Sequence, residues 1–324
     1  MSARLTISIA MTTYNGESFV RAQLDSIACQ TRLPDELVIF DDTSTDTTVS
    51  IVMDFTRHAL FPVRLQANPE RLGSILNYEA AIQACSGEII FLCDQDDTWH
   101  PDKLARIEEQ FICKPETNAV FTDADVVDQA NNSLGFRLWE GIRFSSREQA
   151  QLACDATPVL LKHPVVTGAT MAFRSTYRNL VLPIPNVWAH DAWISILIGT
   201  VSHLTALSIP LVAYRQHSNN QTGVRQRANK HRKKSLIAVH GERLLFFELV
   251  RARLLKFSDS LPITEKQMFC LDEKIAFLRA RAMLPATRWR RLTPVLHELI
   301  ALRYHRYAMG WESFGSDLLH KEKI

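Results

Sequence analysis

Three carboxylates follow directly after an apolar run in the first third of the chain. Residues 89–93, "IIFLC", have the composition of a buried strand, and Asp94, Gln95, Asp96 and Asp97 come immediately after them. Carboxylates packed this closely repel one another unless a cation or hydrogen-bond donors hold them. The segment is therefore either an ordinary solvated acidic turn or part of a site for a divalent metal ion.

Two other polar segments end apolar runs earlier in the chain. "TTYNG" (12–16) follows "ISIAM", and "DDTSTD" (41–46) follows "ELVIF". A tyrosine at the end of a strand can stack on a nucleobase, and a carboxylate on the next loop can accept a hydrogen bond from a base N–H. Together with a metal-holding acidic cluster, these segments describe a binding site for a nucleotide diphosphate. Each segment alone is a weak signal, but their order and spacing make the combination specific.

The stretches between these runs are predicted to be helices. Apolar residues recur on one face of residues 18–29, 46–58 and 74–85, and these stretches alternate with short β-rich runs. Such alternation predicts an α/β fold with a mostly parallel central sheet and flanking helices. In parallel sheets ligands bind outside the carboxyl ends of the strands, so the three polar segments are expected to meet at one edge.

The pattern changes along the chain, and the charge changes with it. We predict a domain over residues 1–224, with a nucleotide-binding half at about 1–115 and an acceptor half at about 116–224, followed by a helical region over 225–324. Residues 1–224 hold 16 Lys and Arg against 25 Asp and Glu, whereas residues 225–324 hold 21 against 10. Net charges of −9 and +11 indicate different partners for the two parts.

The basic C-terminal region has several interpretations. The segment "RQRANKHRKK" (225–234) is a solvated linker or a contact for anionic lipid, and residues 236–257 pair an apolar stripe with Arg and Lys. Such a stripe binds a membrane surface, packs on the protein or contacts a second copy, and amphipathicity alone does not choose between these. We favour a membrane surface over nucleic acid, because no recognised nucleic-acid-binding motif accompanies the charge.

The overall composition is that of an ordinary globular protein. The 324 residues are 46% hydrophobic and 22% charged, with a mean hydropathy of −0.07. No apolar run reaches the roughly 18–20 residues that span a bilayer, and the first residues fit a strand better than a secretory leader. The six cysteines are scattered without a C-x-x-C pair, which argues against a zinc site or a disulfide framework. We therefore expect a cytoplasmic protein, either free or peripheral at the inner face of the membrane.

The chain resembles the inverting glycosyltransferases of family 2, which have a GT-A fold, in three stretches: "ISIAMTTYNGESFVRAQLDSIACQT", "DELVIFDDTSTDTT" and "NPERLGSILNYEAAIQACSGEIIFLCDQDDTWHPDKL". The resemblance covers roughly residues 5–225. Two more stretches, "AHDAWISILI" and "LVAYRQHSNNQTG", are most similar to bacterial rhamnosyltransferase-like members that build cell-surface polysaccharide. The resemblance implies Mg²⁺- or Mn²⁺-dependent transfer from a UDP- or dTDP-linked sugar donor to a glycan or lipid-linked acceptor.

The resemblance also assigns roles to individual residues. Asp94 and Asp96 match the family's Asp-any-Asp motif, with Asp96 as the main metal contact and Asp94 as a nucleotide or metal contact. Asp191, in "WAHDAW", matches the general base. His217 is expected to be a further metal or diphosphate contact, unless it is an ordinary surface histidine. The remaining matches are nucleotide contacts: Tyr14 and Asp41 at the base, Thr12 and Asn15 beside them, and Arg71 and Asn77 near the ribose or phosphates.

One position departs from the family pattern, because Thr43 stands where glycine is usual. If this position requires a positive φ, threonine is a poor fit. A non-catalytic, sugar-nucleotide-binding assembly subunit is the competing function, and the joint presence of Asp94, Asp96 and Asp191 favours the enzyme. An NAD-linked oxidoreductase requires GxGxxG after the first strand, which "TTYNGES" lacks. The sequence leaves oligomerisation open.

Overall fold

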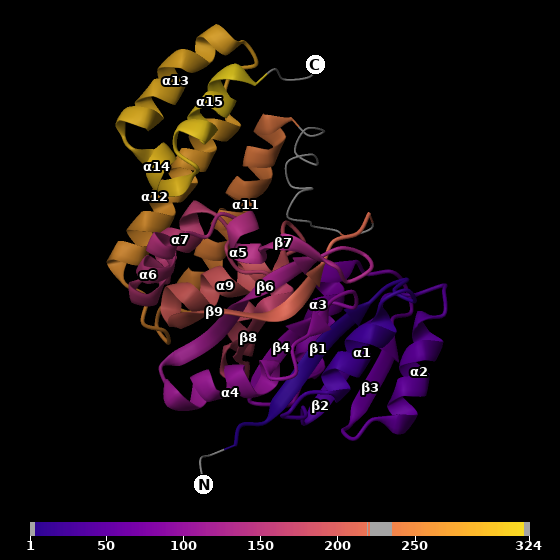
Figure 1. Cartoon of the computed structure of the whole chain (residues 1–324). Helices are drawn as coiled ribbons and strands as arrows, with labels where there is room; N and C mark the ends of the chain where they lie inside the picture. The colour runs from indigo at the N-terminus through magenta and orange to yellow at the C-terminus, as the bar shows by residue number, and fades with distance from the viewer. Residues whose placement is uncertain (1–3, 219, 221–234, 321–324) are drawn as a thin grey trace.

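The computed structural model describes residues 4–218, 220 and 235–320. Its centre is one nine-stranded sheet with helices packed on its faces, and the C-terminal helices extend from one end of this body (Figure 1). The basic segment 225–234 and the predicted boundary between residues 224 and 225 lie outside the described residues.

The first half of the sheet is parallel, as the strand–helix alternation predicts. Neighbouring strands run in the order β3-β2-β1-β4, all in the same direction. Nearly every residue of the two central strands is buried, because helices cover both faces. The elements are β1 (Ile7–Thr13), α1 (Val20–Ala28), β2 (Glu36–Asp41), α2 (Thr48–His58), β3 (Val63–Ala67), α3 (Ser74–Ala84) and β4 (Ile89–Cys93).

The second half of the sheet is mixed. Strand β8 (Met171–Arg174) runs antiparallel to both β4 and β6 (Thr117–Val127), whereas β9 (His203–Arg215) is parallel to β6. The full order is β3-β2-β1-β4-β8-β6-β9-β5, with β7 on the side of β6. The other elements here are β5 (Thr98–Trp99), α4 (Lys103–Cys113), β7 (Ser133–Arg137), α5 (Leu138–Gly141), α6 (Ser146–Cys154), α7 (Ala156–Lys162), α8 (Arg178–Val181) and α9 (His190–Val201).

The C-terminal region is helical, as its periodicity predicts. Phe246 and Phe247 of the first helix are buried and contact Trp188, and this helix packs along the next one. The apolar stripe predicted over residues 236–257 is thus mainly a packing face. No described helix combines the length and apolar character needed to cross a bilayer. The helices are α11 (Leu236–Lys256), α12 (Glu265–Ala282), α13 (Arg288–Ile300), α14 (Arg303–Tyr307) and α15 (Trp311–Leu319).

A buried carboxylate joins four of these helices. Asp317 of α15 is completely buried and accepts hydrogen bonds from Arg281 Nε at 2.6 Å and from the Tyr304 hydroxyl at 2.7 Å. His240 Nε2 of α11 lies 3.1 Å from the same carboxylate. Burial, reinforced by the charge of Arg281, lowers the pKa of His240 to about 4, so a neutral imidazole donates this bond at neutral pH. Removing one partner from such a network is strongly destabilising.

Candidate active site

The polar segments after β1, β2 and β4 lie together at one edge of the sheet, as the sequence predicts. The parallel register places Thr13 beside Asp41, so β1 and β2 end level with one another. The end of β9 reaches the same edge, where the backbone N–H of Arg215 donates to Asp97 at 2.9 Å. Loops from both halves of the sheet therefore contribute to one site.

Asp96 lies against His217. Nε2 of His217 is 2.8 Å from Oδ2 of Asp96, and the side-chain amide of Asn220 donates to the same oxygen at 3.3 Å. The imidazole stacks on Phe19 with ring centroids 4.8 Å apart, which fixes its orientation. A carboxylate oxygen and an imidazole nitrogen are thus presented side by side, and both groups are ligands for divalent metal ions.

Arg215 supports the loop that carries Asp96. Its buried guanidinium donates from Nε to the carbonyl oxygen of Asp96 at 2.7 Å. The two terminal nitrogens of the same guanidinium donate to the carbonyl oxygen of Gln129 at 3.0 Å and to Oδ1 of Asn131 at 3.2 Å. A planar guanidinium can make these bonds simultaneously, whereas a lysine cannot. Arg215 therefore ties the acidic loop to the turn between β6 and β7.

The two other carboxylates of the acidic segment lie deeper. The Tyr78 hydroxyl donates to Oδ1 of Asp94 at 2.7 Å. Burial, together with the charge of Asp96, raises the pKa of Asp94 to about 7. The same two causes raise the pKa of Asp97 well above its usual range. One carboxylate oxygen of Asp97 is buried and has no hydrogen-bond partner among the described residues. This concentration of negative charge is unfavourable by itself, and a bound cation would offset it.

A buried lysine lies beneath the acidic segment. Nζ of Lys103 donates to the carbonyl oxygen of Ala169 at 2.7 Å and lies 3.5 Å from the ring centroid of Trp99. Burial lowers the pKa of Lys103 to about 7, although Asp97 and Asp94 act in the opposite direction. In its protonated form, Lys103 therefore partly balances the charge of the buried acids.

Asp191 lies in the first turn of α9. Its Oδ2 accepts a hydrogen bond from the backbone N–H of Gly168 at 3.0 Å, and its Oδ1 accepts one from Ala192 at 2.7 Å. These two donors fix the orientation of the carboxylate, which a positioned general base requires. Tyr78 links the two acids, because its hydroxyl bonds to Asp94 and its ring stacks on His190, the residue before Asp191. The charge of Asp191 also raises the pKa of Asp94.

His190, the residue before Asp191, packs under the same site. Its imidazole stacks on Tyr78 with ring centroids 4.0 Å apart, and burial lowers its pKa, so the ring is neutral. A Cβ atom added at Gly168 would lie 2.6 Å from Nε2 of His190. Glycine at position 168 therefore allows the loop to approach closely enough for its N–H to reach Asp191.

The predicted nucleobase contacts lie on the loops after β1 and β2. Gln95 holds Tyr14 from both sides: its Oε1 accepts from the Tyr14 N–H and its Nε2 donates to the Tyr14 carbonyl, each at 2.9 Å. The guanidinium of Arg71 lies 4.1 Å from the centroid of the Tyr14 ring. Asn15 has a φ of 45°, and its Oδ1 accepts from the backbone N–H of Thr45 at 2.8 Å. These contacts join the two loops.

Asp41 organises the loop that follows it. Its buried carboxylate accepts from the Thr13 hydroxyl at 2.7 Å and from both the backbone and the hydroxyl of Ser44, at 2.7 and 2.6 Å. Thr43, inside this loop, has a φ of 63°, so the position where the family usually has glycine does adopt the left-handed conformation. The contact of Asp41 with a base stays a prediction.

Two predicted nucleotide contacts lie below the surface of the site. The amide of Asn77 is buried, donates to the carbonyl oxygen of Phe40 at 2.9 Å and accepts from Asn68 at 2.8 Å. Thr12 is almost buried and contacts the hydroxyl of Tyr78. Both residues support the strand ends, and a direct contact of either with a nucleotide stays a prediction.

Sequence reasoning did not assign a role to four residues that shape the site. Gln95 stands inside the acidic segment and Arg215 stands two positions before His217, so their place in the motifs was a usable signal. Tyr78 and Lys103 are inside or at the start of helices, where nothing in the sequence separates them from ordinary packing residues. Their roles depend on which loops the fold brings next to these helices.

The donor set fits a metal ion that is shared between the protein and a diphosphate. No group of three or more His, Cys, Asp or Glu side chains among the described residues is arranged to hold a metal by itself. Mg²⁺ is commonly bound by one or two carboxylates and completed by substrate phosphates, not by an all-protein cage. Asp96, His217 and Asp94 match that type of site.

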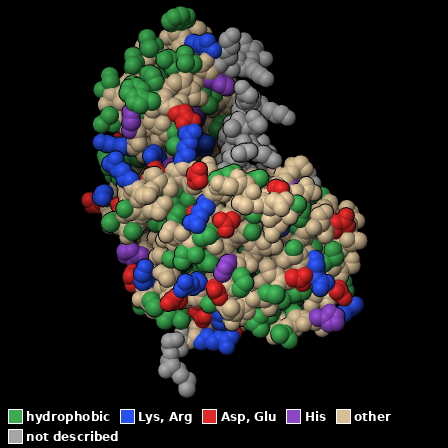
Figure 2. Space-filling view, viewed as in Figure 1, with side chains coloured by type: hydrophobic (Ala, Val, Ile, Leu, Met, Phe, Trp, Pro, Cys, Tyr) green, Lys and Arg blue, Asp and Glu red, His purple; other side chains and the backbone are tan. Residues whose placement is uncertain are grey.

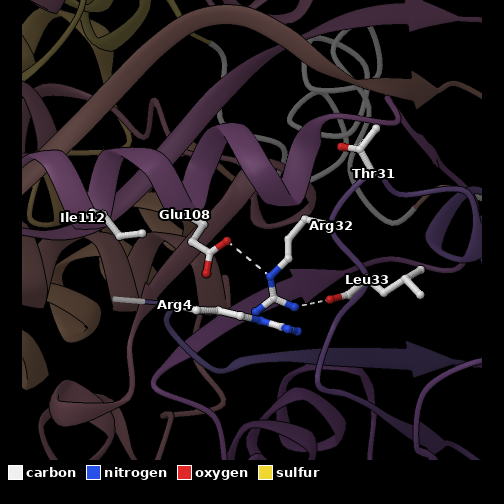
Figure 3. Close-up of a pocket in the computed structure, with 6 residues that line it drawn as sticks. All are labelled: Arg4, Thr31, Arg32, Leu33, Glu108 and Ile112. Atoms are coloured by element: carbon white, nitrogen blue, oxygen red, sulfur yellow. Dashed lines mark hydrogen bonds and ion pairs between the residues drawn. The ribbon is translucent and has the colours of Figure 1, made fainter. Parts of the chain in front are cut away.

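One surface pocket lies away from this site. It has a volume of about 440 Å³ and is lined by residues before β1 and β2 and by α4, at the edge opposite the carboxyl ends of the strands (Figure 3). Inside it, Arg32 Nε lies 3.2 Å from Glu108, and the same guanidinium donates to the carbonyl oxygen of Leu33. Because the polar groups of this open pocket pair with one another, we assign it no part in the chemistry.

Comparison with known proteins identifies the family. Residues 8–165 match the model of glycosyl transferase family 2. The chain is 27% identical over 229 residues to the dTDP-rhamnosyl transferase RfbG of Shigella flexneri, covering 66% of this chain and 73% of RfbG. It is 26% identical over 228 residues to an uncharacterised glycosyltransferase of Nostoc sp., covering 67% of this chain and 66% of that protein. Mycobacterial relatives with 35% identity are matched over only 36% of their length.

Solved structures show the same fold. S. aureus TarS 1–349 in complex with UDP-GlcNAc superposes with a TM-score of 0.60 at 15% identity, covering 94% of this chain and 89% of TarS. The mannosyltransferase PcManGT of Pyrobaculum calidifontis, in complex with GDP-Man and Mn²⁺, gives a TM-score of 0.56 at 19% identity, covering 98% and 86%. The chain therefore carries a glycosyl transferase family 2 domain over residues 8–165, which begins in β1, and it has the GT-A fold.

Proposed function

We propose that this protein is a metal-dependent, inverting glycosyltransferase of cell-surface polysaccharide synthesis, which moves a sugar from a UDP- or dTDP-linked donor to a glycan or lipid-linked acceptor. The observation that carries the proposal is the pairing of Asp96 with His217 at the sheet edge that also holds Asp191. The similarity to RfbG supports a deoxyhexose donor. In this proposal residues 1–115 bind the nucleotide and 116–224 the acceptor.

The residues divide the work as follows. Tyr14 offers an aromatic face to the base, and Arg71, whose guanidinium lies over the Tyr14 ring, contacts the ribose or the phosphates. Asp96, Asp94 and His217 would hold Mg²⁺ or Mn²⁺, which when bound offsets the negative charge that develops on the departing diphosphate.

Asp191 accepts the proton of the acceptor hydroxyl while that oxygen forms its bond to the anomeric carbon and the bond to the diphosphate breaks. The attack comes from the face opposite the leaving group, so one displacement inverts the configuration.

The proposal places the reaction in the cytoplasm, at the inner face of the membrane. Residues 225–324 carry a net charge of +11, which favours contact with an anionic membrane surface and with a lipid-linked acceptor. Nucleic acid has no role in this proposal.

A thermal-shift screen of nucleotide-sugars, with and without Mn²⁺, tests the proposal. A ligand that binds only the folded protein raises its stability by about 2.7 kcal/mol at one hundred times its dissociation constant. We expect one donor class to stabilise the protein, more strongly with Mn²⁺, and then to release free nucleoside diphosphate slowly. Stabilisation without any turnover, given a panel of acceptors, would favour the non-catalytic binding subunit. No stabilisation by any nucleotide-sugar would reject both functions.

A further inference from the structure

Helix α13 exposes its apolar face and buries charged residues. Trp289, Leu292, Leu296 and Ile300 are 88%, 44%, 37% and 80% exposed. Their spacing of three or four residues places them on one side of the helix, as a stripe about 17 Å long. On the opposite side, Arg291 is completely buried and donates to backbone carbonyl oxygens. A surface helix of a globular protein normally has the reverse arrangement.

Positive charge borders this stripe on both sides. At 100° per residue, Arg288 lies on one flank of the stripe, and Arg290 lies on the other beside His297. Glu298, the only acidic residue of α13, is buried and lies 3.2 Å from Arg303. The exposed face of α13 therefore combines four apolar side chains with basic groups and no carboxylate. Figure 2 shows hydrophobic side chains gathered at the end of the molecule that α13, α14 and α15 form.

We propose that α13 docks this protein on an anionic lipid surface, lying parallel to it with the four apolar side chains at the boundary between headgroups and acyl chains. An apolar stripe bordered by arginines is the pattern of helices that bind in the plane of a membrane. Trp289 suits this depth because its ring has an apolar body and one polar N–H. The basic flanks would then lie beside the negative headgroups.

A second copy of the chain fits this face less well. In a two-fold symmetric contact the same patch is present on both sides. The exposed face of α13 has no carboxylate to pair with the arginines of a second α13, so these charges would be brought together without partners. Anionic lipid supplies that missing negative charge. Helix α11, in contrast, buries Phe246, Phe247, Val250 and Leu254 against the protein and exposes only the separate side chains of Leu245 and Leu255, so it fits this role less well.

This inference rests on the membrane contact in the proposed function and assigns that contact to α13. Its test uses no substrate, so it does not depend on enzyme activity. The full chain is sedimented with vesicles of phosphatidylcholine alone and of phosphatidylcholine with phosphatidylglycerol. The variant Trp289→Glu/Ile300→Glu places charge in the stripe. The control Met53→Glu/Leu60→Glu makes the same change of charge at two apolar side chains on or after α2 that are 52% and 85% exposed.

We expect the unaltered chain and the control to bind anionic but not neutral vesicles, and the α13 variant to bind at least about tenfold more weakly. Trp289→Ser/Ile300→Ser should weaken binding without a change of charge, and Arg288→Gln/Arg290→Gln should weaken it and reduce its dependence on salt. Circular dichroism and melting curves verify that all variants fold.

Three outcomes would overturn the proposal. The first is unaltered vesicle binding by the α13 variants, which would place any lipid contact on another part of the chain. The second is no binding by the unaltered chain. The third is an oligomer in analytical ultracentrifugation that only the α13 variants dissociate, which would assign the face to a second copy. A loss of sugar transfer with vesicle binding intact would count against the proposed enzyme and not against the docking helix.

Discussion

The imidazole Nε2 of His217 lies 2.8 Å from a carboxylate oxygen of Asp96, although the two residues are 121 positions apart in the chain. Asp96 follows β4 in the parallel half of the sheet, and His217 follows β9 in the mixed half. The fold thus assembles this pair from two halves, and Arg215 secures the contact by bonding to the backbone of Asp96. A metal ligand set that spans both halves of the sheet would also fix the two halves against one another.

Replacing Asp96 tests the metal assignment. We expect Asp96→Ala to abolish transfer and to remove the effect of Mg²⁺ or Mn²⁺ on nucleotide binding, because it deletes the carboxylate oxygen that faces His217. The measurements are turnover and nucleotide affinity with and without each metal. Asp125→Ala is the matched control, since Asp125 belongs to a second Asp-x-Asp pattern and is exposed. Near-normal, metal-dependent turnover of Asp96→Ala would show that the assignment is wrong.

Replacing Asp191 separates chemistry from binding. The amide oxygen of Asp191→Asn can still accept the N–H of Gly168, so we expect the loop to keep its conformation. Transfer should fall by about 10²-fold or more while donor affinity stays nearly unchanged, as for the loss of a positioned base. Steady-state kinetics and equilibrium donor binding measure the two quantities. An equal loss in both would make Asp191 a ligand or a structural residue.

The strained loop position predicts a stabilising substitution. Thr43 has a φ of 63°, a conformation that costs a residue with a Cβ atom about 1–2 kcal/mol. Glycine removes this cost but loses about 0.5–1 kcal/mol of conformational entropy. We therefore expect Thr43→Gly to raise the free energy of unfolding by up to about 1.5 kcal/mol, measured by urea denaturation. Thr43→Val, which keeps the branched side chain but lacks the hydroxyl, should lower it, and the opposite ranking would contradict the strain.

Acid should destabilise the C-terminal helices through His240. Because the folded protein lowers the pKa of His240 from 6.5 to about 4, it binds this proton less readily than the unfolded chain does. The stability from this group is fully present above pH 6.5 and is lost as the pH falls through about 4, by a few kcal/mol at about 1.4 kcal/mol per pKa unit. Despite burial, hydrogen bonds lower the pKa of Asp317. Protonation of Asp317 therefore also lowers the stability of the folded protein as the pH falls, at a lower pH than for His240.

Urea denaturation between pH 7.5 and 4.5 measures this loss. His240→Gln keeps a side-chain N–H that can reach Asp317 but removes the titration, so we expect a flatter dependence of stability on pH. His58→Gln, at an exposed histidine at the end of α2, should leave the dependence unchanged. If His240→Gln does not change how the free energy of unfolding depends on pH, the acid sensitivity belongs to another group.

The sequence by itself determined the type and order of the elements in the first half of the chain. The period of apolar residues separates strands from helices, and parallel strands joined by helices end at the same edge of a sheet. That rule was sufficient to bring the loops of Tyr14, Asp41 and Asp96 together. The family resemblance added His217 and Asp191, which no periodicity could have selected.

Only the tertiary structure decided which side chains face the site and which faces of the helices are covered. The side chains of Asn77 and Asp41 form hydrogen bonds with the protein itself, below or within the loops. The side chain of Arg215 lies against the backbone of the acidic segment and bonds to it. The stripes of α11 and α13 are both apolar, yet the first is buried and the second is exposed. Periodicity is a local property, whereas burial depends on contacts between segments far apart in sequence, whose packing energies become defined only when the whole chain has folded.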